Sequence, residues 1–359
     1  IIDCVFEGNK ATHFGGAIYA LATNTGFIKP KISNSLFVNN TANSQGGAIY
    51  SQTNFGLGFQ MQLSNSTFVN NNANGAAASV RTSSPSIANG AAVYLRTFGG
   101  FGLGTSYTNN IMWANTINGI GGDVIETITH NYAHSNFRNN LIEGIINGVA
   151  FNSSLGFDIG GNVDSNPFFN DLTDLDGPDD IYGTADDGLN LQQCSPAVDA
   201  GLDAVGIPTK DILGNARFDI PNTGSSIIDM GAFERTKAVE ISVTNNTPVC
   251  VGTTINLNAS VVNTDFANSF SWLADNSRIF DTQNIELLNT TYADSGNYVL
   301  SITSGNCEFL ASTNAKIYEV LTYPLTGERS VYACEASDFK IGLPILESET
   351  PLIYRWQYN

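Results

Sequence analysis

One segment recurs along this chain at a fixed spacing and carries few charged residues. An aromatic residue opens each copy, and Phe6, Phe37 and Phe68 lie 31 residues apart. A glycine-rich stretch follows in each copy: Gly-Gly-Ala-Ile-Tyr at 15–19 and 46–50, and Gly-Ala-Ala-Val-Tyr at 90–94. A fixed period in this range indicates stacked supersecondary units rather than a closed globule.

Residues 1–160 show a pattern of short strands separated by Asn and Gly turns, and helix signals are nearly absent. Three stretches fit the strands of one coil: 32–37, 48–51 and 59–68. Three short strands per coil, with Asn where the chain bends through the left-handed region, predict a right-handed parallel β-helix. The expected fold class is therefore all-β.

Stacked coils would place equivalent residues above one another. We expect the three phenylalanines of the repeats to form one interior ladder. A second ladder is expected from Ile18, Ile49 and Val93. Asn39 and Asn70 would stack at the turns and bond to backbone amides of neighbouring coils.

The pairing of Phe-x-x-Asn with Gly-Gly-Ala-Ile-Tyr resembles the repeats of chlamydial polymorphic outer-membrane proteins, and related repeats occur in bacterial surface β-helices. The resemblance covers roughly the first 100 residues. The third copy departs from the pattern, because Gly90-Ala91-Ala92 replaces Gly-Gly-Ala and residues 72–89 have the character of an inserted loop.

Residues 160–236, here named the closing segment, resemble the end of many secreted β-helix proteins of Bacteroidetes. Five motifs carry this resemblance: 162–169 (Asn-Val-Asp-Ser-Asn-Pro-Phe-Phe), 186–191 (Asp-Asp-Gly-Leu-Asn-Leu), 195–201 (Ser-Pro-Ala-Val-Asp-Ala-Gly), 211–217 (Asp-Ile-Leu-Gly-Asn-Ala-Arg) and 228–234 (Ile-Asp-Met-Gly-Ala-Phe-Glu). We expect the closing segment to cap the last coil, so that its core and strand edge are not left open.

Acidic residues are concentrated in one part of the chain. Residues 171–240 hold 14 carboxylates against four basic side chains, in a protein of net charge −18. Ca²⁺ binds six to eight oxygens from carboxylates and carbonyls in flexible loops, so aspartates alternating with glycine predict a structural Ca²⁺ site. The expected ligands are Asp174, Asp176, Asp179 and Asp187, with Asp180 and Asp186 as further candidates. The alternative is a solvated acidic loop.

Residues 237–319 change to alternating strands. An Asp-x-Gly-x-Tyr turn at 294–298 follows the mid-domain Trp272, which is typical of an Ig-like sandwich. In residues 320–359, Cys334 and Trp356 repeat the 22-residue spacing of Cys250 and Trp272. We therefore expect three parts: a right-handed parallel β-helix with acidic loop and capping segment (1–236), an Ig-like domain (237–319), and the start of a second, truncated Ig-like domain (320–359).

The cysteine placement resembles that of Ig-like repeats in Bacteroidetes surface adhesins, in which a cysteine before the second strand meets one in the final hairpin. This resemblance implies a disulfide between Cys250 and Cys307, with Cys334 lacking its partner. Such a disulfide would stabilise the fold by about 4 kcal/mol on the loop-entropy model, and it implies an oxidising, extracytoplasmic setting. Since the sequence opens inside a repeat and ends within a domain, both ends are expected to continue in a longer protein.

Enzymatic chemistry is not expected. Between residues 30 and 122 the charged side chains are Lys31, Arg81 and Arg96, with no carboxylate. A glycoside hydrolase needs two carboxylates across a groove, and a lyase needs a positioned base. Carboxylates on later coils leave the alternative of a polysaccharide lyase or hydrolase with Ig-like accessory domains. Aromatic residues of the repeats could stack on sugars or serve coil packing: Phe55, Phe59, Phe98, Phe101 and Tyr107.

The sequence predicts an extracellular, outer-membrane-associated adhesin that presents its coils on an Ig-like stalk to glycans or surfaces. The Bacteroidetes resemblance implies type IX secretion, possible partners in the secretion or anchoring machinery, and a role in gliding or biofilm. The net charge of −18 argues against nucleic acid as a partner. No apolar run reaches the length of a membrane span. A spacer without any ligand remains a third interpretation.

Overall fold

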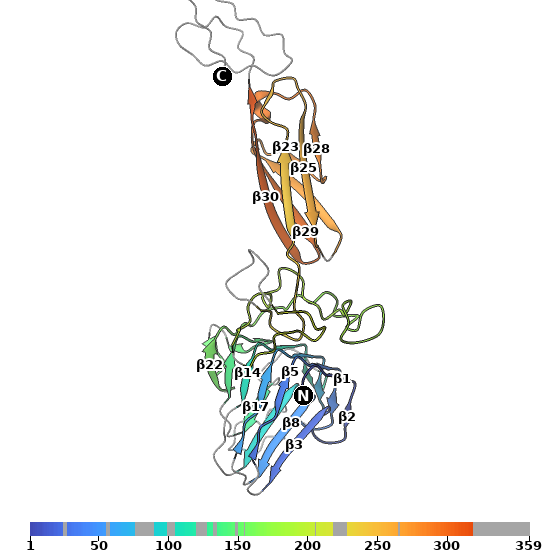
Figure 1. Cartoon of the computed structure of the whole chain (residues 1–359), viewed down its shortest axis with the longest axis vertical. Helices are drawn as coiled ribbons and strands as arrows, with labels where there is room; N and C mark the ends of the chain where they lie inside the picture. The colour runs from blue at the N-terminus through green and yellow to red at the C-terminus, as the bar shows by residue number, and fades with distance from the viewer. Residues whose placement is uncertain are drawn as a thin grey trace, which may run out of the picture. The chain divides into compact units, whose positions relative to one another are not determined.

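The computed structural model describes residues 1–23, 27–54, 58–75, 90–98, 105–119, 128–131, 135–147, 150–153, 155–204, 206–217, 228–264 and 266–318. In these residues the regular elements are β-strands and the short 3-10 helix Tyr292–Asp294, so the protein is all-β (Figure 1). The chain divides into two compact units. The first holds Ile1–Val239 together with Gly305–Cys307, and the second, as far as it is described, holds Glu240–Ser304 and residues 308–318.

Four parallel sheets of four or five strands build the coils of the first unit. One sheet contains β1 (Val5–Glu7), β6 (Leu36–Val38), β11 (Thr67–Val69), β15 (Ile111–Trp113) and β19 (Leu141–Ile142). A second contains β5 (Lys31–Ser33), β10 (Gln62–Ser64), β14 (Ser106–Thr108), β18 (Asn136–Arg138) and β22 (Phe157–Gly160). Successive strands in each sheet come from successive coils, so each coil rests on the next.

The other two parallel sheets complete the coils. One contains β2 (Lys10–Ala11), β7 (Thr41–Ala42), β12 (Asn72–Ala73) and β16 (Thr116–Ile117). The other contains β3 (Ile18–Thr23), β8 (Ile49–Asn54), β13 (Val93–Phe98) and β17 (Ile128–Asn131). Two further pairs are the parallel β4 (Phe27–Ile28) with β9 (Gly58–Phe59) and the antiparallel β20 (Ile146–Asn147) with β21 (Ala150–Phe151).

The coils contain more strands than the sequence predicts. The expected strand at 32–37 is divided into β5 and β6, and the one at 59–68 into β9, β10 and most of β11. The physical reason lies at Asn34 and Asn65, whose φ angles of 49° and 46° turn the chain sharply between the paired strands. Asn tolerates this left-handed conformation better than most residues with a side chain.

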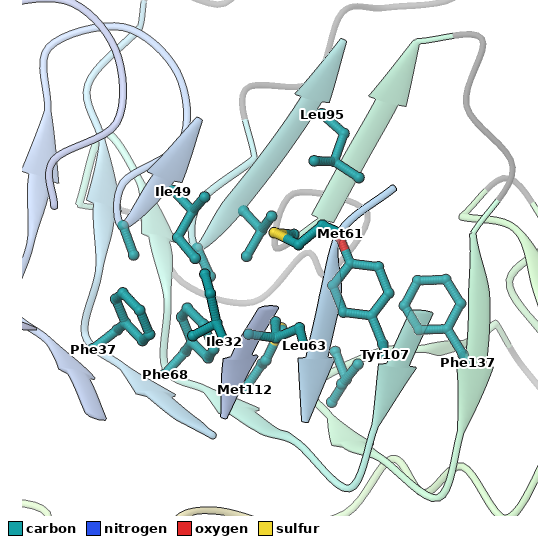
Figure 2. Close-up of a cluster of buried hydrophobic side chains, with 14 of the residues drawn as sticks. Ile32, Phe37, Ile49, Met61, Leu63, Phe68, Leu95, Tyr107, Met112 and Phe137 are labelled. Atoms are coloured by element: carbon teal, nitrogen blue, oxygen red, sulfur yellow. The ribbon is translucent and has the colours of Figure 1, made fainter. Parts of the chain in front are cut away.

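The expected ladder of phenylalanines is confirmed in the interior (Figure 2). The rings of Phe6 and Phe37 stack at 4.7 Å between centroids, and those of Phe37 and Phe68 at 4.4 Å. These distances match the spacing of neighbouring strands, because each ring lies directly over its equivalent in the next coil. The second expected ladder is also in register: Ile18, Ile49 and Val93.

The two glycines of the repeat have separate structural roles. Gly46 adopts a φ of +68°, which favours glycine. A side chain at Gly47 would place its Cβ 2.0 Å from the carbonyl oxygen of Ala91 on the next coil. Gly16 stands in the same relation to Gly47, at 2.1 Å. The second glycine is therefore required by the close approach of one coil to the next.

Most of the closing segment covers the side of the coil stack, and only its first residues cap the last coil as expected, where Val163 pairs with Leu141 and Asn162 accepts a hydrogen bond from the Asn140 N–H. The sheet of β1, β6, β11, β15 and β19 has an outer face that is also largely apolar. This outer face contributes Leu36, Val38, Val69, Ile111 and Leu141 to a second core. The closing segment contributes Phe169, Leu175, Leu189, Leu191, Ala197, Met230, Ala232 and Phe233. Consecutive apolar residues in β6 serve both cores, because a strand buried on both faces needs apolar side chains on each.

The second unit consists of antiparallel sheets. One contains β23 (Glu240–Asn245), β25 (Ile255–Val262) and β28 (Ile285–Leu287). The other contains β27 (Ile279–Phe280), β26 (Asn268–Ala274), β29 (Gly296–Ser304) and β30 (Cys307–Ala315). Trp272 is fully buried in the core, and the Tyr298 hydroxyl donates a 2.8 Å hydrogen bond to the Asp294 carbonyl. The short strands β24 (Val249–Cys250) and β31 (Ile317–Tyr318) pair in parallel.

The expected disulfide between Cys250 and Cys307 is wrong, because Cys307 is bonded to Cys194. Cys250 pairs with Tyr318 beyond the far end of β30, whereas Cys307 begins that nine-residue strand. An extended strand of this length separates its ends by about 26 Å, and bridged Cα atoms lie within about 7 Å. Cys250 is itself disulfide-bonded, and Cys334 lies outside the described residues.

Candidate functional site

Buried asparagines hold neighbouring coils together at one corner of the stack. The Oδ1 atom of Asn71 accepts hydrogen bonds from the backbone N–H and the Nδ2 of Asn40, at 3.1 and 2.9 Å. Asn71 in turn donates from the same two groups to Oδ1 of Asn115, at 3.0 and 2.9 Å. This ladder was expected at Asn39 and Asn70, which are exposed and have φ angles of 57° and 56°. The stacking residue is therefore the second Asn of each pair.

A further set of asparagines faces the closing segment. Their side-chain amides donate to its backbone carbonyls. The pairs are Asn34 with Lys210, Asn65 with Asp229 (3.4 Å), Asn109 with Leu202 (3.0 Å) and Asn139 with Ala200 (2.9 Å). All four asparagines have positive φ angles at equivalent turns of successive coils. The turn residues that shape the coils therefore also bind the closing segment.

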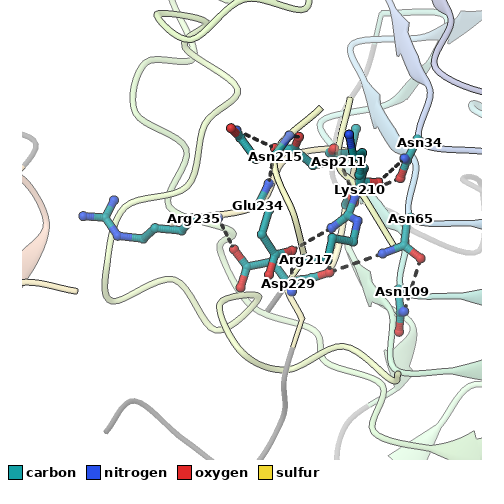
Figure 3. Close-up of polar contacts among 12 residues, drawn as sticks. Asn34, Asn65, Asn109, Lys210, Asp211, Asn215, Arg217, Asp229, Glu234 and Arg235 are labelled. Carbon is teal, nitrogen blue, oxygen red and sulfur yellow. Dashed lines mark hydrogen bonds and ion pairs between the residues drawn. The ribbon is translucent and has the colours of Figure 1, made fainter. Parts of the chain in front are cut away.

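A buried ionic network fixes the same segment (Figure 3). The Arg217 guanidinium donates to Glu234 Oε2 at 2.8 Å, to Asn34 Oδ1 at 2.9 Å and to the Gly231 carbonyl at 2.9 Å. Asp211 accepts hydrogen bonds from the backbone N–H groups of Asn215 and Glu234, at 2.7 and 3.1 Å. These contacts join motifs 211–217 and 228–234 to the first turn asparagine.

Carboxylates outnumber the cation in this network. Asp229 is fully buried and accepts 2.7 Å hydrogen bonds from the backbone N–H groups of Asp199 and Arg235. Burial raises the pKa of Asp229, and burial followed by the charge of Asp229 raises the pKa of Glu234. Burial also lowers the pKa of Arg217, although the nearby carboxylates oppose this effect. Asp229 and Glu234 therefore stay protonated to a higher pH than exposed carboxylates do.

The predicted calcium ligands divide into two groups. Asp174 and Asp176 are half-buried, and loss of solvent followed by the charges of Asp176 and Asp171 raises the pKa of Asp174. Burial, followed by the charge of Asp176, raises the pKa of the neighbouring Tyr182 to about 12. A cation here would relieve this repulsion, so the donor chemistry fits Ca²⁺. In the part of the chain that the structure describes, no three His, Cys, Asp or Glu side chains are grouped to hold a metal ion.

The remaining predicted ligands shape the loop. Asp187 is fully buried, and its two carboxylate oxygens accept hydrogen bonds from the N–H groups of Gly183 and Thr184, at 2.8 and 3.1 Å. Burial raises the pKa of Asp187 against the effect of these bonds. The exposed Asp179 accepts from the Ile181 N–H at 2.9 Å. Asp186 and Asp180 are also exposed, and Asp186 accepts from the Thr184 hydroxyl at 2.7 Å.

Tyr107 does not contact solvent, so its expected role in binding sugars is wrong. The side chain is fully buried and its ring stacks on Phe137 at 4.6 Å (Figure 2). Burial raises the pKa of Tyr107 above its ordinary value. The side chains of the other expected contacts lie outside the described residues: Phe55, Phe59, Phe98 and Phe101.

Two carboxylates on the later coils support turns. Glu143 Oε2 accepts a 2.8 Å hydrogen bond from the backbone N–H of Ala114 on the preceding coil. Asp164 accepts from the N–H groups of Gly144 and Ile146, at 2.8 and 3.3 Å. Each carboxylate thereby satisfies backbone donors at a bend, which is a structural use of its charge.

Comparison with known families gives a match for two stretches of the first unit. The Chlamydia polymorphic membrane protein repeat matches residues 3–21 and 34–52. Each matched stretch runs from the strand of the phenylalanine ladder to the Gly-Gly-Ala-Ile-Tyr strand of the same coil. The two matched stretches together cover about a tenth of the chain. No helix in the described residues is long and apolar enough to cross a membrane. No curated protein matches the chain.

Solved structures similar to this chain include the amphioxus IgVJ-C2 molecule, at 17% identity and a TM-score of 0.21. Another contains three N-terminal domains of the highly immunogenic outer capsid protein of bacteriophage RB49, at 20% identity and a TM-score of 0.20. Each alignment covers 26% of this chain. They cover 54% and 33% of the respective other chains.

Proposed function

We propose that the chain belongs to a cell-surface adhesin in which a right-handed parallel β-helix, the first unit, is displayed on Ig-like domains, beginning with the second. The match to the polymorphic membrane protein repeat carries the proposal of surface exposure. The parallel coils with in-register ladders and the sandwich-like pair of antiparallel sheets support the two fold assignments. Type IX export and a role in gliding or biofilm rest on the Bacteroidetes resemblance alone.

A rigid, weakly charged surface suits attachment to neutral ligands. Because coil stacking satisfies backbone groups and buries a continuous core, such a stack holds a long surface in one shape. The low charge of residues 30–122 leaves that surface without a strong electrostatic preference. We therefore propose glycans or other uncharged surfaces as ligands.

Surface exposure is tested on intact cells that express the full-length protein. An antibody against the first unit should label these cells, and external protease should remove the label. Cells lacking the protein should attach less to glycan-coated surfaces. Labelling that requires permeabilised cells would contradict surface exposure. Unchanged attachment of the cells that lack the protein would contradict a role in adhesion.

Binding to sugars is tested separately with the purified chain on a glycan array. Retention of specific neutral glycans is expected, and a heat-unfolded sample serves as the control. The alternative of a polysaccharide lyase or hydrolase is tested by incubation with a polysaccharide panel, followed by detection of reducing ends and unsaturated products. Release of either product would favour the enzyme over the adhesin.

We also propose that Asp174 and Asp176 contribute to a structural Ca²⁺ site. Their mutual repulsion and partial burial support this proposal. Ligand at 100 times its Kd stabilises a fold by about 2.7 kcal/mol, so millimolar Ca²⁺ should raise the Tm of the chain. The increase should disappear in Asp174→Asn/Asp176→Asn and persist in Asp203→Asn, which removes charge at an exposed position outside the loop. Equal increases in both variants would exclude this site.

A further inference from the structure

The disulfide between Cys194 and Cys307 closes a large covalent loop. The two cysteines are separated by 113 positions in the sequence. The loop contains the rest of the closing segment and every strand from β23 to β29. The chain enters it at Cys194 and leaves it at Cys307, where β30 begins.

Both cysteines of this disulfide belong to the first unit, which includes Gly305–Cys307. Hydrogen bonds hold the surrounding residues in place. Gln192 is buried, and its Oε1 accepts a 3.0 Å hydrogen bond from the N–H of Asn306. Its Nε2 donates to the Phe169 carbonyl at 2.9 Å, and its backbone N–H donates to the Phe168 carbonyl at 2.9 Å. The Cys194 N–H lies 3.2 Å from Cys307 Sγ. The disulfide is therefore supported by the buried Gln192, which is itself bonded to Phe169 of the second core.

We propose that this disulfide carries tension past residues 195–306 when the protein is pulled along its length. Force in a cross-linked chain follows the shortest covalent path, and the bond between the two sulfur atoms replaces the whole loop. The closing segment beyond Cys194 and strands β23–β29 are then outside the loaded path. Motif 228–234 can remain on the outer face of the coils while the flanking chain bears the load.

This inference goes beyond attachment and does not depend on it. A protein anchored on one side and bound on the other experiences force between its ends, but the loop shortens the loaded path whatever the ligand is. Loss of glycan binding would leave the inference intact. Conversely, a failure of the force measurement would leave the adhesin proposal untouched.

Single-molecule force spectroscopy on the full chain, with handles at its two ends, tests the inference. Cys250 takes part in another disulfide, so all samples carry Cys250→Ser. The oxidised sample should extend about 400 Å less at full unfolding than the same sample with Cys194→Ser and Cys307→Ser, given the separation of 113 residues. Adding Cys4→Ser, which removes the cysteine that is free in the described residues, should change nothing.

A second measurement avoids dependence on the folding of the variant that lacks Cys194 and Cys307. The oxidised Cys250→Ser sample is extended at constant force until its length no longer changes, and a reductant is then added. A release of about 400 Å after reduction is expected, because the hidden loop of 113 positions joins the loaded path. Full extension before reduction, or no release after it, would overturn the inference.

Discussion

Arg217 and Glu234 form an ion pair that is closed off from solvent. The Nη1 and Oε2 atoms are 2.8 Å apart, and each side chain is only 1% exposed. Both residues come from the closing segment, yet Arg217 also donates to Asn34, a turn residue of the coil stack. The pair therefore couples the internal structure of the closing segment to its position on the coils.

Replacement of Arg217 by Met should destabilise the first unit by about 3–5 kcal/mol, because buried carboxylates would lose their cation. Arg278→Met is the matched control. Arg278 pairs with Asp294 at 2.7 Å, but its side chain is 50% exposed, and exposed pairs contribute about 1 kcal/mol or less. Amide hydrogen exchange with mass spectrometry assigns each change to its unit. Equal losses in the two variants would contradict the assigned role of Arg217.

The stability of the closing segment should increase as the pH falls from 8 to 5. The folded pKa values of Asp229 and Glu234 are raised by burial above those of unfolded carboxylates. The folded chain therefore binds more protons between about pH 4 and the raised values, and the free energy of unfolding decreases as pH rises through that window. The expected difference is on the order of 1–2 kcal/mol, measured by urea titration at each pH.

Glu234→Gln provides the control for this pH dependence. An amide at position 234 cannot titrate but keeps nearly the same shape. The difference between pH 5 and pH 8 should therefore shrink in this variant. If the free energy of unfolding changed between pH 5 and pH 8 by the same amount in Glu234→Gln as in the wild-type chain, the pH dependence would belong to other groups.

The period of the repeat predicted the interior of the coils well. Equivalent apolar residues in parallel coils must lie over one another, so Phe6, Phe37 and Phe68 could be assigned to one ladder from their spacing alone. The strand boundaries were harder to predict from the sequence, because Asn34 and Asn65 introduce turns inside continuous runs of strand-forming residues. The choice between Asn39 and Asn40 was also ambiguous, since adjacent asparagines differ only in the direction of their side chains.

The position of the closing segment depends on contacts between distant residues. The signal for its docking face was present in Leu36-Phe37-Val38, where the lack of alternation indicates burial on both sides. Nothing in that run identifies the residues that cover it. The pairing of Cys194 with Cys307 has the same origin, because it depends on how Gln192 and Asn306 meet. Local spacing and family resemblance do not determine such contacts.

Asn71→Ala should cost the first unit several times more stability than Asn74→Ala. Asn71 is fully buried, and its Nδ2 donates at 2.8 Å to the Phe37 carbonyl while its Oδ1 bonds to Asn40. Truncation leaves buried partners unsatisfied, at a cost of about 1–3 kcal/mol each. Asn74 is exposed, so its loss should remain within about 0.5 kcal/mol. Thermal unfolding by circular dichroism compares the two variants, and similar Tm values would refute the ladder as a stabilising element.

Gly231→Val should detach motif 228–234 from the coils. A Cβ at Gly231 would lie 2.7 Å from Ile111 Cδ1 and 2.8 Å from Thr67 Oγ1, both on the outer face. Gly214→Val is the matched control, because both glycines have similar positive φ angles, 92° and 85°, but nothing lies within 4 Å of a Cβ at Gly214. Both variants therefore carry the same backbone strain, and only the first adds a steric clash. Limited proteolysis should cleave the closing segment faster in Gly231→Val than in Gly214→Val, and equal rates would mean that this contact does not hold the segment in place.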